Sequence, residues 1–256
     1  MSSAPGPVSE RPPGFRHLSV LIHLGLTLIV LGLLALVILD WFPGYLFVAD
    51  GGWQALFLLS GTALVLGPML TWLVANPAKP RHLLWLDLSL IAGLQLLALA
   101  AGAWLIREQR PCAVFWVDGT LYSRPWSAFA DEPAARQRIA QLTEQQPAWI
   151  AIDMPADPFA REPLIRNALR NRSSVEFNAS LYIPFSTTLP QVRAAARKLA
   201  GKPLPPDLAA GLAAAGIAPE TLREGRLLLL PARSRYGNGH LVLEPETGRV
   251  VFRLFP

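Results

Sequence analysis

Three long apolar runs in the first 110 residues constrain the fold of this chain more than any other feature. They cover residues 18–39, 53–75 and 83–106, and Asp87 is the one formally charged residue among them. A helix of about 20 apolar residues crosses the hydrocarbon core of a bilayer. The sequence therefore predicts a three-helix transmembrane bundle in residues 17–110, preceded by a cytoplasmic tail in residues 1–16.

The charged residues are concentrated in the rest of the chain. Residues 111–256 hold 17 of the 23 Lys and Arg and 13 of the 18 Asp and Glu, which is typical of a globular domain. The net charge of +5 comes from scattered side chains. Because no dense basic stripe is present to neutralise phosphates, a nucleic-acid partner is not expected.

The basic residues predict the orientation of the three helices. The tail and loop 76–82 each carry two Lys or Arg, whereas loop 40–52 carries none. Cytoplasmic loops are enriched in these residues, which places residues 111–256 outside, in the periplasm of a Gram-negative cell. Arg107 and Arg110 weigh mildly against this orientation. The first run is too long for the apolar part of a signal peptide and is interpreted as a permanent span.

Small residues mark possible packing faces on the first two spans. Gly25 and Gly32 are seven residues apart and fall on one face of a helix, where small side chains let a second helix approach closely. Gly67 and Pro68 interrupt the second span, and proline removes a helical hydrogen bond, so a kink is expected there. All four are candidate contacts for a partner's transmembrane helix.

Two polar residues of the third span are further candidates. Asp87 lies about one turn from the predicted cytoplasmic end, and an acid within a span is costly enough to indicate function. It can also extend to the membrane surface and serve no binding role. Gln95 lies nearer the middle of the bilayer, where its amide requires a partner. That partner is either another protein or a neighbouring span of the same chain.

Aromatic side chains are crowded in the first loop. Trp41 and its neighbours form either an aromatic belt at the outer interface or, with Pro43, a shaped re-entrant hairpin. Trp41 and Pro43 are candidate partner contacts. A second candidate surface is Arg124 with Trp126, because arginine and tryptophan dominate the hot spots of protein interfaces. A stacked surface tryptophan is the alternative explanation of Trp126, and it is the commoner one.

Residues 111–256 predict an α+β domain that ends in an antiparallel meander. Asn238 and Gly239 suit a two-residue hairpin turn, and residues 246–248 suit a short bulged turn. Expected helices are 132–142, 159–171, 189–200, 208–215 and 219–223, and expected strands are 113–118, 148–153, 175–184, 226–230, 240–244 and 249–255.

Catalytic and metal-binding patterns are scarce. Asp153 and Asp157 follow a predicted strand, a position that serves acid–base chemistry, Ca²⁺ binding or simple turn formation. His240 is the one histidine beyond the spans and their loops, so a histidine pair for zinc is lacking there. The single cysteine, Cys112, predicts a buried thiol or an intermolecular disulfide. We therefore expect no enzyme activity, no cofactor, no metal and no small-molecule substrate.

One set of motifs in the first half of the chain resembles a known family. The residues that carry the resemblance are, in order, Trp41 to Phe47, Gly51 with Gly52, Leu66 to Thr71, Asp87 with Leu88, Gln95, and Arg110 with Pro111. With these motifs, roughly residues 16–120 resemble the type IV pilin accessory proteins of the X/Z type.

The resemblance implies an inner-membrane accessory protein. Such a protein would bind the transmembrane helix and the head domain of the major type IV pilin. It would act as a chaperone-like factor that modulates pilin stability or supply for pilus assembly. The alternative function is a membrane-anchored periplasmic ligand-binding or sensor domain, which predicts a concave pocket in residues 111–256.

Overall fold

The computed structural model describes residues 14–76, 78–144, 146–170 and 173–255. Within them the chain forms two compact units. The first contains residues up to Trp41 and Trp53–Arg107, and the second contains Phe42–Gly52 and residues from Glu108 onwards. Most of the predicted tail, with Arg11, lies outside the described residues. So do Pro77 of the second loop and Asn171 at the end of a predicted helix.

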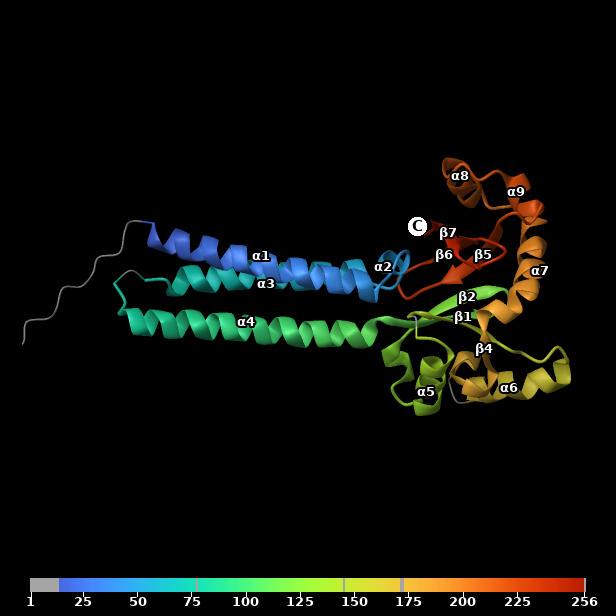
Figure 1. Ribbon diagram of the computed structural model, residues 1–256, viewed down its shortest axis with the longest axis horizontal. Coiled ribbons are helices and arrows are strands. Elements are labelled where there is room, and N and C mark those ends of the chain that lie inside the picture. The colour runs from blue at the N-terminus through green and yellow to red at the C-terminus, as the bar shows by residue number, and fades with distance from the viewer. Residues whose placement is uncertain (1–13, 77, 145, 171–172, 256) are drawn as a thin grey trace, which may run out of the picture. The chain divides into compact units, whose positions relative to one another are not determined.

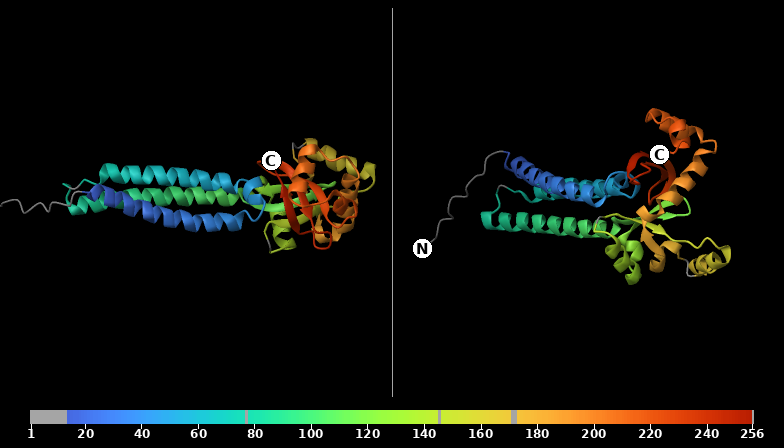
Figure 2. Two further views of the ribbon diagram at one scale, coloured as in Figure 1. Left: turned by 90° about the horizontal axis from the view of Figure 1, so that it is seen from above. Right: turned by 45° about the vertical axis from the view of Figure 1, so that its right-hand side comes forward.

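The first unit consists of three long helices that run side by side in both views of Figure 2. They are α1 (Phe15–Trp41), α3 (Gly52–Val74) and α4 (Arg81–Gln109), and each is long and apolar enough to span a membrane. The three predicted helices are confirmed. α1 and α4 extend beyond their apolar runs at both ends, because helical hydrogen bonding continues into the more polar flanks, whereas α3 matches its run to within one residue.

The second unit is built on a seven-stranded mixed sheet with the order β4-β3-β1-β2-β5-β6-β7 (Figure 1). The β1–β3 and β2–β5 pairs are parallel, and the other four are antiparallel. The strands are β1 (Pro111–Val117), β2 (Thr120–Pro125), β3 (Ala148–Ile152), β4 (Tyr182–Pro184), β5 (Leu228–Arg233), β6 (Asn238–Leu243) and β7 (Val250–Leu254). The α+β class and the closing meander β5–β6–β7 are confirmed.

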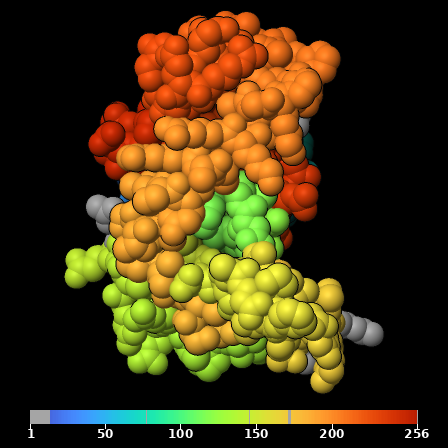
Figure 3. All heavy atoms as spheres, turned by 90° about the vertical axis from the view of Figure 1, so that its right-hand side faces the viewer, coloured from blue at the N-terminus to red at the C-terminus, as the bar shows by residue number. Residues whose placement is uncertain are grey.

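Helices cover both faces of this sheet. Figure 3 shows α6 (yellow) and α7 (orange) with the β1–β2 hairpin (green) between them. The helices of this unit are α2 (Leu46–Ala49), α5 (Pro133–Leu142), α6 (Pro158–Arg170), α7 (Leu189–Ala200), α8 (Pro206–Ala214) and α9 (Pro219–Arg223). α6 continues through Pro163, although the sequence allowed for a shorter helix.

Alternating side chains divide the core between the two faces of the sheet. In β1, Val114 faces the cluster that includes Val192 of α7, whereas Phe115 faces the cluster that includes Ile139 of α5. In a strand successive side chains point to opposite faces. β1 is therefore apolar on both sides, because it lies near the middle of a sheet that is covered twice.

Two predictions for the second unit are wrong. Residues 175–184 form 3-10 turns at Val175–Phe177 and Ala179–Leu181, and only the last three residues form a strand, β4. Asn238 and Gly239 belong to β6, where they pair with Arg233 and Ala232. The turn before them spans residues 234–237 and closes with a hydrogen bond from the Ser234 N–H to the Gly237 carbonyl. The Asn-Gly pair thus extends the ladder instead of ending it.

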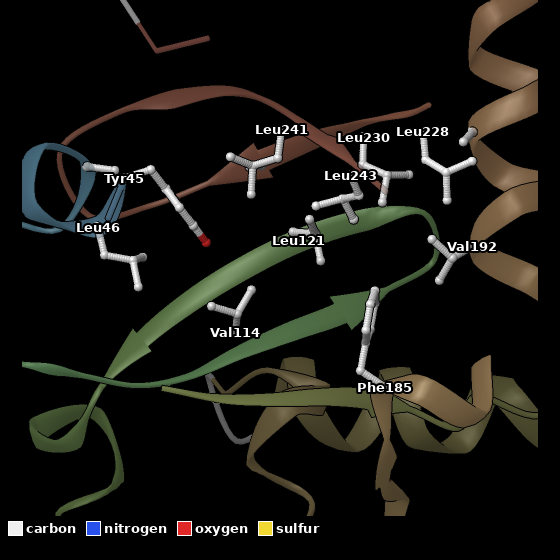
Figure 4. Close-up of a cluster of buried hydrophobic side chains, with 13 residues drawn as sticks. Tyr45, Leu46, Val114, Leu121, Phe185, Val192, Leu228, Leu230, Leu241 and Leu243 are labelled. Atoms are coloured by element: carbon white, nitrogen blue, oxygen red, sulfur yellow. The ribbon is translucent and has the colours of Figure 1, made fainter. Parts of the chain in front are cut away.

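The first loop belongs to the sheet and not to the long helices. Phe42, Tyr45 and Leu46 are buried, and Tyr45 and Leu46 join the cluster that contains Val114 and Leu121 (Figure 4). The sequence placed this loop in the membrane domain, at the outer interface. Aromatic rings suit either environment, and here the loop supplies core residues to the sheet unit.

Candidate partner-binding surfaces

A polar cluster lies inside the three-helix unit. Gln95 of α4 is hydrogen-bonded through Oε1 to His23 Nε2 of α1 at 2.7 Å. The Gln95 amide group donates to Thr27 Oγ1 at 3.1 Å and to the Ala63 carbonyl of α3 at 3.4 Å. Gln95 therefore links all three helices. The expectation that its amide requires a partner is met within the chain.

His23 completes the cluster. Its Nδ1 lies 3.0 Å from Thr71 Oγ1 of α3, and the Thr71 side chain is buried. In the tautomer with the proton on Nε2, His23 donates to Gln95 and accepts from the Thr71 hydroxyl, so that both ring nitrogens are satisfied. A polar group without a partner is costly in hydrocarbon, and this pairing removes that cost.

Gly67 makes room for the His23–Gln95 hydrogen bond. An added Cβ would overlap Gln95 Oε1 and lie 2.6 Å from His23 Nε2. Pro68 follows within α3, which continues to Val74 without ending. The close approach of α3 to this cluster therefore depends on the missing side chain at position 67.

Asp87 has a partner within its own unit. Lys79, in the connection before α4, forms an ion pair with the Asp87 carboxylate. Both side chains are about one third exposed or less. The pair neutralises the one acid predicted within a span, which lowers the cost of its position near the helix end.

Gly25 and Gly32 face away from the other helices. A Cβ at either position would meet no heavy atom within 4 Å. The buried residues of α1 are Thr27, Leu31 and Ile38, which lie on the opposite side at about 100° of rotation per residue. The two glycines therefore lie on an open face of α1.

The first loop is fastened to the sheet by polar contacts. The Tyr236 N–H donates to the Ala49 carbonyl at 2.9 Å, and the Tyr236 ring occupies the space where a Cβ of Gly51 would lie. Tyr45 stacks on Phe255 with ring centroids 5.7 Å apart. Trp41 and Pro43 are half-buried at the start of this segment, so part of each side chain remains accessible.

Asp50 is the buried acidic residue of this loop. Its Oδ1 accepts from Ser123 Oγ at 2.7 Å and from the Arg235 N–H at 3.0 Å. Its Oδ2 is buried and has no hydrogen-bond partner within the described residues. Burial raises the pKa of the Asp50 carboxyl, and the two hydrogen bonds and the charges of Arg124 and Arg235 oppose that shift only in part.

Arg124 is held inside the sheet unit. Its Nε donates to Glu176 Oε1 at 2.9 Å, and Nη2 contacts the same oxygen. Glu176 is buried, so the guanidinium compensates a carboxylate that water does not reach. Trp126 is half-buried beneath Arg136, whose guanidinium carbon lies 5.3 Å from the ring centroid. The guanidinium of Arg124 is therefore used in a contact within the fold, whereas part of the Trp126 side chain remains accessible.

A groove of about 950 Å³ lies in the second unit. Its walls come from the first loop at Pro43–Leu46, from β3 and the end of β4, and from β7. The residues that line this groove come from four separate segments of the chain, so no local sequence pattern marks it.

Of the two acids considered for catalysis, Asp157 has a structural role. Asp157 Oδ1 accepts the Phe159 N–H at 3.1 Å, at the start of α6. Across the described ranges, no three His, Cys, Asp or Glu side chains are grouped to hold a metal ion. Cys112 is fully buried and donates to the Arg124 carbonyl at 3.2 Å, as predicted for a structural thiol.

Comparison with known sequences decides the family. The fimbrial assembly protein of serogroups C1 and C2 of Dichelobacter nodosus is 38% identical over 94 residues, which cover 36% of this chain and 72% of that protein. This chain belongs to the fimbrial assembly protein family. The fimbrial assembly proteins of serogroups E1 and I of the same organism are each 29% identical over 182 residues, or 70% of both chains. No family model and no solved structure matches the chain.

Sequence reasoning missed several residues of these candidate surfaces. His23, Thr27 and Thr71 were not singled out, although a histidine inside an apolar run signals an internal polar partner. Asp50 was not singled out either. Its link to Ser123, 73 residues later, has no local signature.

Proposed function

We propose that this protein is an inner-membrane accessory factor that binds the major type IV pilin and modulates its stability or supply for pilus assembly. The observation that carries the proposal is the membership of the fimbrial assembly protein family. Three helices fit for a membrane and a separate sheet unit agree with a partner that has an apolar helix and a globular head. The role is chaperone-like, and no catalytic step is assigned to it.

The proposed orientation follows from the basic residues. Arg16, Lys79 and Arg81 flank the ends of the helices assigned to the cytoplasm. The sheet unit then lies in the periplasm, where the head of an exported subunit is accessible. A carboxyl-terminal alkaline phosphatase fusion tests this, because that reporter is active only after export. An inactive fusion with normal expression would contradict the orientation.

The open face of α1 is the proposed contact for the pilin helix. Gly25 and Gly32 leave a shallow surface on which a second helix can pack closely. Gln95, Gly67 and Pro68 are then assigned to holding the three helices together, because their contacts are internal. Asp87, paired with Lys79, maintains the end of α4. In this proposal Gly25 and Gly32 contact the partner helix, and the other residues hold the three helices in place.

Site-specific photo-crosslinking in cells tests the contact. A benzophenone amino acid at position 29, an exposed site on the face of Gly25 and Gly32, should yield an adduct with pilin. The matched control is position 31, where Leu31 is buried against the other helices. An adduct that is equally abundant at both positions, or absent from position 29, would argue against a specific contact on this face.

The alternative of a periplasmic ligand-binding or sensor domain is favoured by one observation, the groove in the second unit. A sensor also needs a cytoplasmic part that passes on its signal. The loop between α3 and α4, which is assigned to the cytoplasm in this proposal, is short and carries only a few polar residues, which weighs against a sensor. Native mass spectrometry of the purified protein separates the two functions, because a small molecule that is retained at stoichiometric level would support the alternative.

A further inference from the structure

The groove in the second unit combines apolar walls with positive charge. Trp149, Phe185 and Val250 supply apolar surface. Tyr45 and Leu46 also line the groove, and they lie at the opposite end of the buried cluster from Phe185 (Figure 4). The charged side chains that line it are two arginines, Arg249 and Arg253. An occupant that is complementary to these walls is apolar and carries a carboxylate.

Arg253 is available for such a carboxylate. Its Nη1 donates to the Gly44 carbonyl at 3.2 Å, and within the described residues no carboxylate lies within 4.0 Å of its guanidinium. Arg249 is differently placed, because its Nε lies 3.7 Å from Glu244 Oε2. Among the described residues, Arg253 thus has no carboxylate partner, and its side chain is exposed.

The strand that carries Arg253 has a free edge. β7 ends the sheet and pairs only with β6 among the described strands. Pro231 lacks an N–H, so its pair with His240 is a non-hydrogen-bonded one, and the hydrogen bonds of His240 are directed to Leu254 of β7. By alternation, the N–H and C=O of Arg253 point away from β6. An incoming strand would find these groups unpaired.

We propose that this groove binds an extended segment of the pilin head, which adds to β7 as a further strand and places a carboxylate on Arg253. The inference rests on the proposed function for the identity of the partner. Its chemistry follows from the groove alone: main-chain hydrogen bonds from the edge strand, apolar side chains on Trp149 and Phe185, and an Asp, Glu or carboxyl-terminal group at the guanidinium.

Photo-crosslinking of the full-length protein in pilin-producing cells tests the groove. The crosslinking residue replaces Val251 on β7, and the matched control replaces Val48, a valine of similar exposure outside the groove. We expect a pilin adduct at position 251 and none at position 48. Mass spectrometry of the adduct should identify a pilin peptide that contains a carboxylate next to the crosslinked residue.

Charge variants test the role of Arg253. Arg253→Glu should reduce the adduct at position 251 roughly tenfold, as for the loss of a charge-assisted hydrogen bond. Arg226→Glu, a charge reversal at an exposed site that does not line the groove, should leave it unchanged. Protection of Cys112 from maleimide shows that each variant is folded. If Arg253→Glu exposes the Cys112 thiol, Arg253→Ala replaces it, because alanine removes the guanidinium without adding a negative charge.

The adduct at position 29 separates this inference from the proposed function. A pilin adduct at position 29 together with a second copy of this chain, a lipid or no adduct at position 251 would overturn the groove proposal alone. So would an adduct that Arg253→Glu leaves unchanged. No pilin adduct at either position would overturn both. A pilin adduct at position 251 but not at position 29 would support the groove proposal and contradict the proposed contact on α1.

Discussion

Asp50 and Ser123 share a hydrogen bond of 2.7 Å, although 73 residues and two long helices separate them in the chain. The bond joins the loop after α1 to strand β2. It is one of a set of contacts, with the Arg235 N–H and the Ala49 carbonyl, that make the loop an integral part of the sheet. The stability of the second unit should therefore depend on a residue that precedes the second span.

Asp50→Ala should lower the free energy of unfolding by about 1–3 kcal/mol, because the Ser123 hydroxyl and the Arg235 N–H would lose their acceptor. Asp50→Asn keeps an acceptor oxygen and should be tolerated. Thermal denaturation of the full-length protein in detergent, followed by near-ultraviolet circular dichroism, measures both. Equal stability of Asp50→Ala and the parent chain would show that the bond contributes nothing.

The raised pKa of Asp50 predicts a pH dependence of stability. Because burial penalises its ionised form in the folded state, the contribution of this group is fully present below the ordinary carboxyl pKa. It is lost as pH rises through the raised pKa. Midpoints measured between about pH 4 and pH 7 should fall less steeply with pH for Asp50→Asn. Parallel curves for the two proteins would contradict the shift.

Gly67→Ala should destabilise the helical unit by about 1–3 kcal/mol, since the new methyl group would overlap Gln95 and His23. Gly25→Ala is the matched control, because its methyl group meets no atom within 4 Å. Titration with sodium dodecyl sulfate in mixed micelles, monitored by helicity, compares the two. If both variants unfold at the same detergent fraction, the packing at position 67 is not as tight as described.

Gln95→Leu should weaken the helical unit by about 0.6–2 kcal/mol, the range for hydrogen bonds between membrane helices. The substitution removes the carbonyl that pairs with His23 and the amide that donates to Thr27. The same mixed-micelle titration applies. The double variant with His23→Leu should lose less than the sum of the single losses, because the second change removes a group already left without its partner.

Arg124→Ala should cost the sheet unit about 3–5 kcal/mol, since Glu176 would remain buried without its cation. Glu176→Gln should cost less, because it removes the buried charge and leaves an acceptor. Urea denaturation of the full-length protein distinguishes them. If Arg124→Ala lowers the free energy of unfolding only slightly, Arg124 does not stabilise the fold, and the predicted partner contact with Trp126 would again be its main role.

Cys112 should react with maleimide only after denaturation. The side chain has no exposed surface, and burial raises the pKa of its thiol to about 12, so almost no thiolate forms at neutral pH. Labelling in detergent with and without urea, read by mass spectrometry, tests this. Rapid labelling of the native protein would indicate that β1 opens readily.

Local sequence patterns predicted where helices and strands form better than they predicted which strands pair with one another. The helix at Pro219–Arg223 and the meander follow directly from local signals. The hairpin at β1–β2 was missed, although Asp118 and Gly119 occupy its turn with positive φ of 46° and 86°, which is the usual signature of a tight hairpin. Pairing of β2 with β5 across more than 100 residues has no local signal.

The candidate site was predictable in part for the same reason. A mid-membrane amide demands a partner, and Gln95 was identified on that ground. Its actual partners, His23 and Thr27, are decided by helix rotation, which composition does not specify. Tyr45 illustrates the converse: an amphipathic ring satisfies a membrane interface and a sheet core equally, and only the tertiary fold selects between them.

The packing of the loop at Phe42–Gly52 on the sheet also has a consequence for the order in which the second unit folds during synthesis. Tyr45 and Leu46 leave the ribosome before any strand of the sheet exists, and their binding site is complete only when β5 and β6 have been synthesised. The apolar side chains of this loop therefore remain uncovered while α3 and α4 are synthesised. A chain truncated before β5 and β6 would leave Tyr45 and Leu46 without most of their cluster, and exposed apolar surface of this kind favours aggregation.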